Sequence, residues 1–234
     1  MFKDDRVKEI LCYGDSNTWG CIPRWHDSKE PSLRYDKVTR WPMVMQSLLG
    51  DGYHIIEEGL CGRTSVFDRP NEPFKNGETC LKAAILTHRP LDLVIMMLGT
   101  NDLFTDTQPD KEHLGDGISR LCDIIQNTPK SGYGAKPPMI MLIPPTRIIR
   151  AQGRISVYPK FGNDKGGDLS KAFPAVYSKV AKEKGTYFLD NSAYAEPSLA
   201  DGVHWTPDSH VLTGRAAAEK VKEIFGDISE AENE

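Results

Sequence analysis

The sequence predicts an α/β fold in which helices cover both faces of a parallel sheet. Apolar runs of strand length recur along the chain, and segments with helical periodicity lie between them. Within each run the apolar residues are continuous and do not alternate with polar ones, which is typical of strands buried on both faces. Together these two features indicate a parallel sheet with helical crossovers.

Five segments are the expected strands, because each is a short and mostly apolar run of strand length. They are residues 9–13 (EILCY), 53–57 (YHIIE), 92–98 (DLVIMML), 139–143 (MIMLI) and 187–190 (YFLD).

Helices are expected where apolar residues recur every three or four positions. The clearest stripe places Trp41, Val44, Met45, Leu48 and Leu49 on one face, with Pro42 in the first turn and Gly50 after the end. Two further stripes run through residues 118–125 and 173–180. A last helix should begin after Thr206 as its N-cap, with Pro207 as its first residue.

Length and composition favour one globular domain over residues 1–234. Hydrophobic residues make up 39% of the 234 positions and charged residues 26%. No apolar run is long enough to span a membrane. The net charge of −4, with both signs interspersed, argues against nucleic acid or an anionic membrane as a partner.

The five cysteines are odd in number, widely spaced and without a CxxC pair. This pattern favours reduced thiols over a disulfide framework or a zinc site, and we expect no metal. The start of the chain, MFKDDRVKEI, lacks the apolar region of a secretory signal, so we expect a cytoplasmic location.

Four polar clusters stand where a parallel sheet would bring them together. Ser16 follows the first expected strand, Gly62 the second and Asn101 the third, while Asp201 and His204 precede the last helix. Sites in such folds lie beyond the carboxyl ends of the strands, so these residues should meet at one rim. They supply a hydroxyl nucleophile, a backbone amide, a side-chain amide, a carboxylate and an imidazole, which is the set that acyl transfer needs.

Each cluster also has a purely structural interpretation. Ser16 in Gly-Asp-Ser could serve only as a helix cap, and no second glycine completes the GxSxG elbow of the α/β-hydrolases. Gly62 and Asn101 could be ordinary turn residues, and Asp102 is better explained as a residue that closes its turn. The Asp201 and His204 pair favours catalysis, because a separation of three residues on a loop lets the carboxylate orient the ring.

Two tryptophans flank the expected nucleophile and base. Trp19 and Trp205 are candidates for the wall of an acyl pocket, although tryptophans more often belong to the core. Two irregular stretches, residues 21–40 and 144–169, are rich in proline, glycine and charge. Loops of that length often serve as lids or contact surfaces.

The clusters GDSNTWG, EEGLCGRTS, LGTND and DGVHWT together resemble the conserved blocks of the SGNH hydrolases, also called the GDSL esterase and lipase family. The longer strings are similar to its arylesterase and acyltransferase branch. The resemblance implies a flavodoxin-like three-layer α/β/α sandwich with a five-stranded parallel sheet. It differs at Asn17, where the family name implies leucine, and there we expect a change at the pocket entrance.

The resemblance also implies the roles of the residues. Ser16 would be the nucleophile, His204 the general base and acid, and Asp201 the residue that orients the imidazole. The oxyanion hole would comprise the amides of Ser16 and Gly62 and the side chain of Asn101. Members of this branch often form homo-oligomers, whose long loops build a narrow apolar channel.

The expected function is a serine esterase that hydrolyses small carboxylic esters through an acyl-enzyme, without a cofactor. The same acyl-enzyme could transfer the acyl group to an alcohol or a peroxide. A carbohydrate deacetylase or a thioesterase could use the same three residues. The alternative outside the enzymes is a flavin-binding, flavodoxin-like module, since a Ser, Asn and Thr loop after the first strand could also hold a phosphate. That alternative leaves Asp201 and His204 unexplained.

Overall fold

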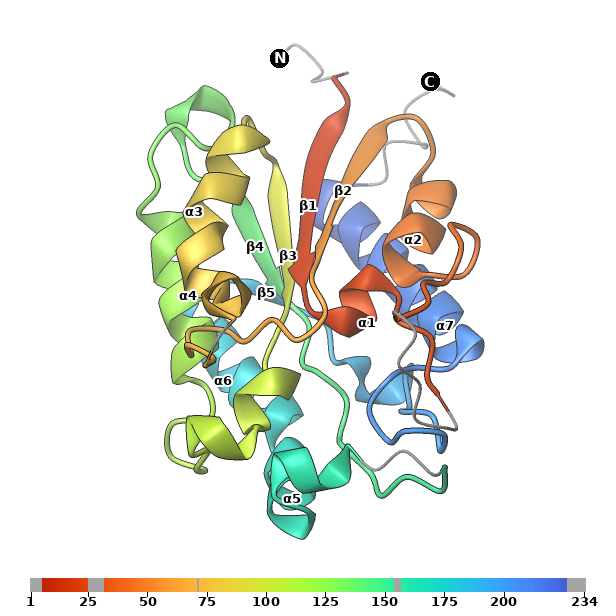
Figure 1. Cartoon of the computed structure of the whole chain (residues 1–234). Helices are drawn as coiled ribbons and strands as arrows, with labels where there is room; N and C mark the ends of the chain where they lie inside the picture. The colour runs from red at the N-terminus through yellow and green to blue at the C-terminus, as the bar shows by residue number, and fades with distance from the viewer. Residues whose placement is uncertain (1–5, 25–31, 71, 154–156, 227–234) are drawn as a thin grey trace.

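Five parallel strands form one sheet in the order β2-β1-β3-β4-β5 (Figure 1). The computed structural model describes residues 6–24, 32–70, 72–153 and 157–226. The strands are β1 (Lys8–Gly14), β2 (Tyr53–Gly59), β3 (Leu93–Met97), β4 (Met139–Leu142) and β5 (Tyr187–Phe188). All five expected strands are confirmed, and the order is that of a flavodoxin-like sheet.

Helices cover both faces of this sheet, as the continuous apolar strands predicted. Figure 1 shows α3, α4 and α6 on one face and α2 and α7 on the other. The α-helices are α1 (Ser16–Trp19), α2 (Trp41–Leu49), α3 (Gly77–Thr87), α4 (Asp116–Gln126), α5 (Asp164–Ser170), α6 (Phe173–Lys184) and α7 (Pro207–Phe225). Within the described ranges, short 3₁₀ helices join the longer elements at Pro73–Lys75, Thr100–Leu103, Thr105–Thr107, Tyr133–Ala135, Tyr158–Phe161 and Asn191–Ala193.

The predicted helix boundaries agree closely with α2, α4, α6 and α7. Gly50 caps the end of α2, and the Thr206 hydroxyl accepts a hydrogen bond from the amide of Ser209 at the start of α7. Helix α3 was not predicted. It starts at a glycine, and its buried side is narrow, with only Gly77, Leu81 and Ile85 buried, so its apolar stripe is weak.

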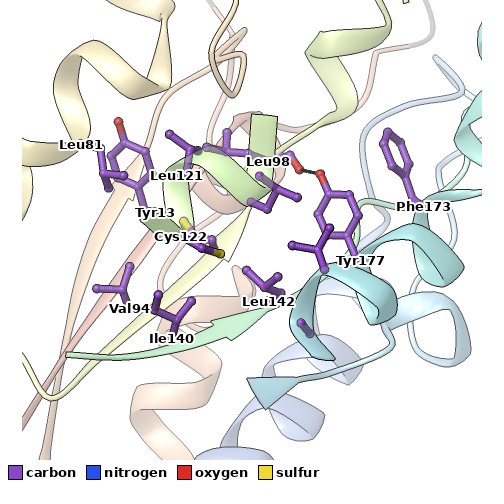
Figure 2. Packing of buried hydrophobic residues seen from close by; sticks show 14 of the residues in the cluster. Tyr13, Leu81, Val94, Leu98, Leu121, Cys122, Ile140, Leu142, Phe173 and Tyr177 are labelled. Atoms are coloured by element: carbon purple, nitrogen blue, oxygen red, sulfur yellow. Dashed lines mark hydrogen bonds between the residues drawn. The ribbon is translucent and has the colours of Figure 1, made fainter. Parts of the chain in front are cut away.

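Two apolar cores lie on either side of the sheet. The core under α3, α4 and α6 is the larger, and Figure 2 shows part of it around Leu142, Leu121 and Tyr177. The core under α2 and α7 is built around Trp41, Met45 and Trp205. Because residues of β1 and β3 alternate between the two cores, both central strands are buried on both faces.

One buried hydrogen bond anchors the carboxyl end of β3. The Tyr177 hydroxyl, from α6, donates to the carbonyl of Leu98, and Figure 2 shows the two groups facing each other. The next residue, Gly99, has φ +131°, and a Cβ there would lie 2.3 Å from the Tyr177 oxygen. Only glycine fits this position, and it directs the chain into the turn that carries Asn101.

The two irregular stretches contain defined structure. Part of residues 21–40 folds back on itself, since the amide of Ile22 donates to Leu33 and that of Tyr35 to Gly20. Part of residues 144–169 forms the 3₁₀ helix Tyr158–Phe161 and helix α5. Residues 25–31 and 154–156 of these stretches lie outside the described residues. In the part of the chain that is described, no helix combines the length and apolar character needed to cross a bilayer.

Candidate active site

The loops that follow β1, β2 and β3 meet the segment before α7 at one end of the sheet. Ser16 is the first residue of α1, directly after β1. Gly62 lies three residues beyond the end of β2, and Asn101 lies in the 3₁₀ turn that follows β3. His204 reaches the same point from the segment that leads into α7.

Ser16, His204 and Asp201 form a continuous hydrogen-bonded chain. The Ser16 hydroxyl and Nε2 of His204 are 3.0 Å apart, and Nδ1 of His204 lies 2.8 Å from Oδ2 of Asp201. A carboxylate only accepts, so Nδ1 carries the proton and Nε2 accepts from the serine when the ring is neutral. This is the arrangement in which an imidazole can remove the hydroxyl proton.

Asp201 is held by the backbone of its own turn. Its Oδ1 accepts hydrogen bonds from the amides of Val203, at 3.0 Å, and His204, at 2.9 Å. Burial acts to raise the pKa of Asp201, but the hydrogen bond and charge of the His204 ring, together with the two backbone amides, outweigh burial and lower the pKa. Asp201 is therefore an anion fixed beside the ring.

Asp201 shifts the pKa of His204 upward. Burial acts to lower the pKa of His204, but the hydrogen bond and charge of Asp201, together with the contact of the Cys21 thiol, raise it above its ordinary value. Asp201 therefore stabilises the imidazolium that forms when the ring takes a proton.

The aspartate of the Gly-Asp-Ser motif caps helix α1. Oδ1 of Asp15 accepts from the amide of Asn17 at 3.0 Å, and burial raises the pKa of Asp15 to about 6. The role of helix cap, which the sequence left open for Ser16, is therefore filled by Asp15. Ser16 itself, 6% exposed, points to His204.

The side-chain amide of Asn101 is fixed by the loop after β2. Its Nδ2 donates to the carbonyl of Arg63 at 2.9 Å. An amide nitrogen has two hydrogens, so this bond uses one and orients the other. Asn101 and Gly62, whose φ is +80°, both line the cavity that contains Ser16 and His204.

Two buried polar residues brace these loops and were not predicted to do so. Asp102 accepts from the amide and hydroxyl of Ser65, at 2.7 and 2.6 Å, so it ties the loop after β3 to the loop after β2 instead of closing its own turn. The Arg63 guanidinium donates to the carbonyl of Gly14 at 3.0 Å and lies over the Tyr13 ring.

Asn17 lies in the interior beneath His204 and not at the pocket entrance. Its Nδ2 donates to the carbonyl of Val203 at 3.3 Å, and its Oδ1 accepts from the amide of Trp205 at 3.2 Å. These two backbone groups flank His204. The expectation that Asn17 alters the entrance is therefore corrected: Asn17 holds the segment that carries the histidine.

Ser16 and His204 open into a cavity of about 490 Å³. Its described wall includes the apolar side chains Phe104, Val157, Phe161 and Val203. It also includes five charged side chains, those of Arg69, Glu72, Lys75, Asp106 and Lys160. The channel is thus only partly apolar, in contrast to what the resemblance implied. Both irregular stretches contribute to it, the first through Cys21 and Ser32 and the second through Val157, Lys160 and Phe161.

Neither tryptophan assigned to an acyl pocket is part of the cavity wall that the described residues form. Trp205 is fully buried in the core under α2 and α7, where its indole nitrogen donates to the Thr146 hydroxyl at 2.9 Å. Trp19 lies at the end of α1 under the Arg34 guanidinium. The pocket assignment is therefore corrected, because neighbours of the site residues in sequence point to other sides of the backbone.

Cys21 and Cys61 belong to the cavity wall although the sequence suggested no role for them. The one signal in the sequence is position: Cys21 lies two residues after Trp19 and Cys61 two residues after Gly59, on loops that follow adjacent strands. Across the described ranges, no three His, Cys, Asp or Glu side chains are grouped so that they could hold a metal ion.

The family model of the GDSL-like lipase/acylhydrolase family matches residues 12–212. Among solved structures, the carbohydrate acetylesterase Est24 from Sinorhizobium meliloti is 34% identical, with a TM-score of 0.86 over 93% of this chain and 100% of that chain. The M. smegmatis aryl esterase is 31% identical, with a TM-score of 0.84 over 93% and 99%. A putative arylesterase from Agrobacterium tumefaciens str. C58 is 33% identical, with a TM-score of 0.82 over 93% and 100%.

No curated protein matches the chain by sequence. The family match covers most of the chain, and it includes all four polar clusters that converge on the cavity. The chain therefore belongs to the GDSL-like lipase/acylhydrolase family, the SGNH hydrolases that its motifs resemble.

Proposed function

We propose that the protein is a serine esterase that hydrolyses small carboxylic esters through an acyl-enzyme on Ser16. The observation that carries the proposal is the hydrogen-bonded chain from Ser16 through His204 to Asp201, beside a cavity large enough for a small ester. Family membership supports the same reaction class.

In the first half-reaction, His204 removes the Ser16 proton as the oxygen attacks the ester carbonyl. The imidazolium, stabilised by Asp201, then returns that proton to the departing alcohol. In the second half-reaction, water replaces the alcohol and His204 acts as base again. An alcohol or peroxide in place of water would give acyl transfer, and product analysis in aqueous alcohol distinguishes the two outcomes.

The charge that develops on the carbonyl oxygen needs fixed hydrogen-bond donors. We assign this role to the amides of Ser16 and Gly62 and to the second N–H of Asn101. The bond from Asn101 to the Arg63 carbonyl supports the assignment, because it holds the side chain in place before substrate arrives.

The experiment combines a panel of p-nitrophenyl esters of increasing acyl length with labelling by a serine-directed phosphonate. We expect hydrolysis of the short esters, phosphonylation of the peptide that contains Ser16, and loss of both in Ser16→Ala. The matched control is Ser178→Ala, an exposed serine on α6. Labelling at another residue, or turnover by Ser16→Ala, would contradict the proposal.

A sugar acetyl ester is a second candidate substrate. The charged groups in the cavity wall favour a polar substrate, and one of the structural relatives above is a carbohydrate acetylesterase. Comparing kcat/KM for an acetylated sugar with that for p-nitrophenyl acetate tests this. A higher value for the sugar would assign the enzyme to carbohydrate deacetylation.

We propose a cytoplasmic location and assembly into homo-oligomers for this esterase. All five cysteines are free, which supports a reducing compartment. Exposed apolar side chains at Leu33 and Val38, 64% and 79% exposed, support a subunit contact near residues 21–40. Cell fractionation and size-exclusion chromatography with light scattering test the two statements separately.

A further inference from the structure

Two thiols stand side by side in the wall of the active-site cavity. Cys21 is 4% exposed and Cys61 is partly exposed, and both line the cavity that contains Ser16 and His204. The esterase mechanism uses neither of them. Two neighbouring thiols that face a cavity can react with a small oxidant and then with each other.

The backbone brings the two cysteines together. Strands β1 and β2 are adjacent and parallel, and the amide of Leu60 donates to the carbonyl of Gly14 at 3.1 Å. Gly59 packs against the backbone of Trp19 so closely that a Cβ there would lie 2.2 Å from the Trp19 nitrogen. Cys21 and Cys61 each follow two residues later, on neighbouring chain segments.

The side chains complete this contact. The thiols of Cys21 and Cys61 lie close enough for each to shift the pKa of the other, and the Cys21 thiol shifts the pKa of His204. The amide of Cys21 donates to the carbonyl of Ser16 at 2.9 Å, which ties its position to that of the serine. Any covalent change at Cys21 therefore occurs in contact with the groups that we propose act on the ester.

The two thiols differ in reactivity. The hydrogen bond from Cys21 and the nearby Lys75 ammonium lower the pKa of Cys61, although burial opposes them. The pKa of Cys21 is raised by its hydrogen bond to Cys61 and by burial. Cys61 is thus the better nucleophile towards an oxidant, and Cys21 remains a thiol placed to react next.

We propose that Cys21 and Cys61 form a redox-modification site at which a hydroperoxide converts the two thiols into a disulfide in the cavity wall. The Cys61 thiolate attacks the peroxide O–O bond, takes one oxygen as sulfenic acid and releases an alcohol, or water from hydrogen peroxide, after protonation. The Cys21 sulfur then displaces hydroxide from Cys61, and its own proton completes a water molecule. Two electrons leave the thiols and reduce the peroxide.

The disulfide would lower esterase activity, and this consequence rests on the proposed function. A disulfide holds its sulfurs about 2.05 Å apart. Drawing Cys21 towards Cys61 removes the thiol contact with His204 and changes the cavity wall beside Ser16. Reduction restores both thiols, so the loss of activity is reversible.

The test starts from reduced, desalted protein that is treated with hydrogen peroxide in the absence of ester and then with catalase. We expect the intact mass to fall by two hydrogen atoms and a non-reducing peptide map to contain a Cys21 to Cys61 cross-link. We also expect loss of most of the kcat/KM for p-nitrophenyl acetate and its recovery with dithiothreitol. The mass and the map report on the disulfide whether or not the protein hydrolyses esters.

Variants, each compared with its own untreated activity, identify the order of events. Cys61→Ser should form no cross-link and lose no activity, whereas Cys21→Ser should stop at a Cys61 sulfenic acid that dimedone labels. Cys80→Ser, which alters a cysteine on α3, should respond as the unaltered protein does. A cross-link between other cysteines, or a Cys21 to Cys61 disulfide that leaves kcat/KM unchanged, would overturn the proposal.

Discussion

Single side chains in this site are oriented by backbone groups of neighbouring loops before any substrate binds. Asn101 is held by the carbonyl of Arg63, and Asp201 by the amides of Val203 and His204. Groups that are fixed in advance need no reorganisation when charge develops, which is why they stabilise a transition state better than mobile ones.

Replacing Asn101 with alanine tests the proposed oxyanion donor. Loss of one such donor typically costs about 2.7 to 4 kcal/mol, so kcat for p-nitrophenyl acetate should fall by roughly two to three orders of magnitude. Steady-state kinetics on Asn101→Ala measure this, with the exposed Asn127→Ala as control. A kcat near that of the unaltered enzyme would remove Asn101 from the mechanism.

Asn17 offers a test of how the histidine is positioned. In Asn17→Leu, the carbonyl of Val203 and the amide of Trp205 lose their side-chain partner, and each unpaired buried group costs about 1–3 kcal/mol. We expect a lower free energy of unfolding and a kcat that falls more than KM changes, because His204 loses its support. Urea unfolding and steady-state kinetics give the two numbers. An unchanged kcat in a destabilised protein would leave Asn17 with a purely structural role.

At the scale of elements, the short segments at the carboxyl ends of the strands set the geometry. The segment before α7 is held on one side by Asn17 and on the other by residues 149–152. Gly202 lies at that second contact, with φ +78°, and a Cβ there would stand 2.0 Å from the carbonyl oxygen of Ile149. The amide of Ile149 in turn donates to the carbonyl of Gly202 at 3.0 Å.

Gly202→Ala should therefore displace the turn between Asp201 and His204. Both the left-handed backbone and the contact with Ile149 oppose a methyl group, so we expect a stability loss of about 1–3 kcal/mol and a marked fall in kcat/KM. Gly185→Ala is the matched control, because Gly185 has φ +63° at the end of α6 but no atom within 4 Å of the place where a Cβ would lie. It should lose stability with normal kcat/KM, and an equal kinetic effect in both variants would contradict the argument.

At the scale of the whole molecule, the interface between α2 and α7 encloses an ionisable group. His210 is fully buried between Tyr35 and Trp205, and its Nδ1 accepts from the amide of Trp41 at 3.4 Å. Burial, and next the charge of His204, lower the pKa of His210 to about 3. The folded protein therefore holds this ring neutral, while the unfolded chain binds a proton near pH 6.5.

The contribution of His210 to stability should fall as the pH is lowered through 6.5, because the unfolded state gains the proton first. From the two pKa values, the loss at pH 5 is about 2 kcal/mol. We subtract the free energy of unfolding at pH 5 from that at pH 7.5. In His210→Gln, which keeps an acceptor, this signed difference should be about 2 kcal/mol lower than in the unaltered protein. Urea unfolding at the two values measures it, with His54→Gln, an exposed histidine, as control. Equal pH dependence in His210→Gln and the unaltered protein would contradict the role of His210.

Two buried carboxyl groups act in the opposite direction. Burial raises the pKa of Asp15 and of Asp102 to about 6 in the folded protein, so their contribution to stability is present at low pH and is lost as the pH rises through 6. Both groups are present in His210→Gln and in the unaltered protein. The difference between the two proteins therefore isolates the histidine.

Features that depend on a short stretch of sequence could be predicted, whereas features that depend on distant segments could not. The five strands and helices α2, α4, α6 and α7 follow from apolar runs, stripes and caps within short windows. The convergence of Ser16, Asn101 and His204 followed from the rule that parallel strands place their carboxyl ends at one edge. Helix α3 was missed because its buried stripe is weak, and Trp205 was misplaced because proximity in sequence does not give side-chain direction.

The sequence by itself determined the α/β class, the strand positions and the residue types that meet at the site, since periodicity and motif order are written along the chain. Only the tertiary structure decided that Asn17 supports the backbone on both sides of a histidine 187 positions away, that Cys21 meets Cys61, and that charged side chains enter the cavity wall. These features depend on where side chains of distant segments point. That direction is set by the packing of loops against one another, which no local pattern encodes.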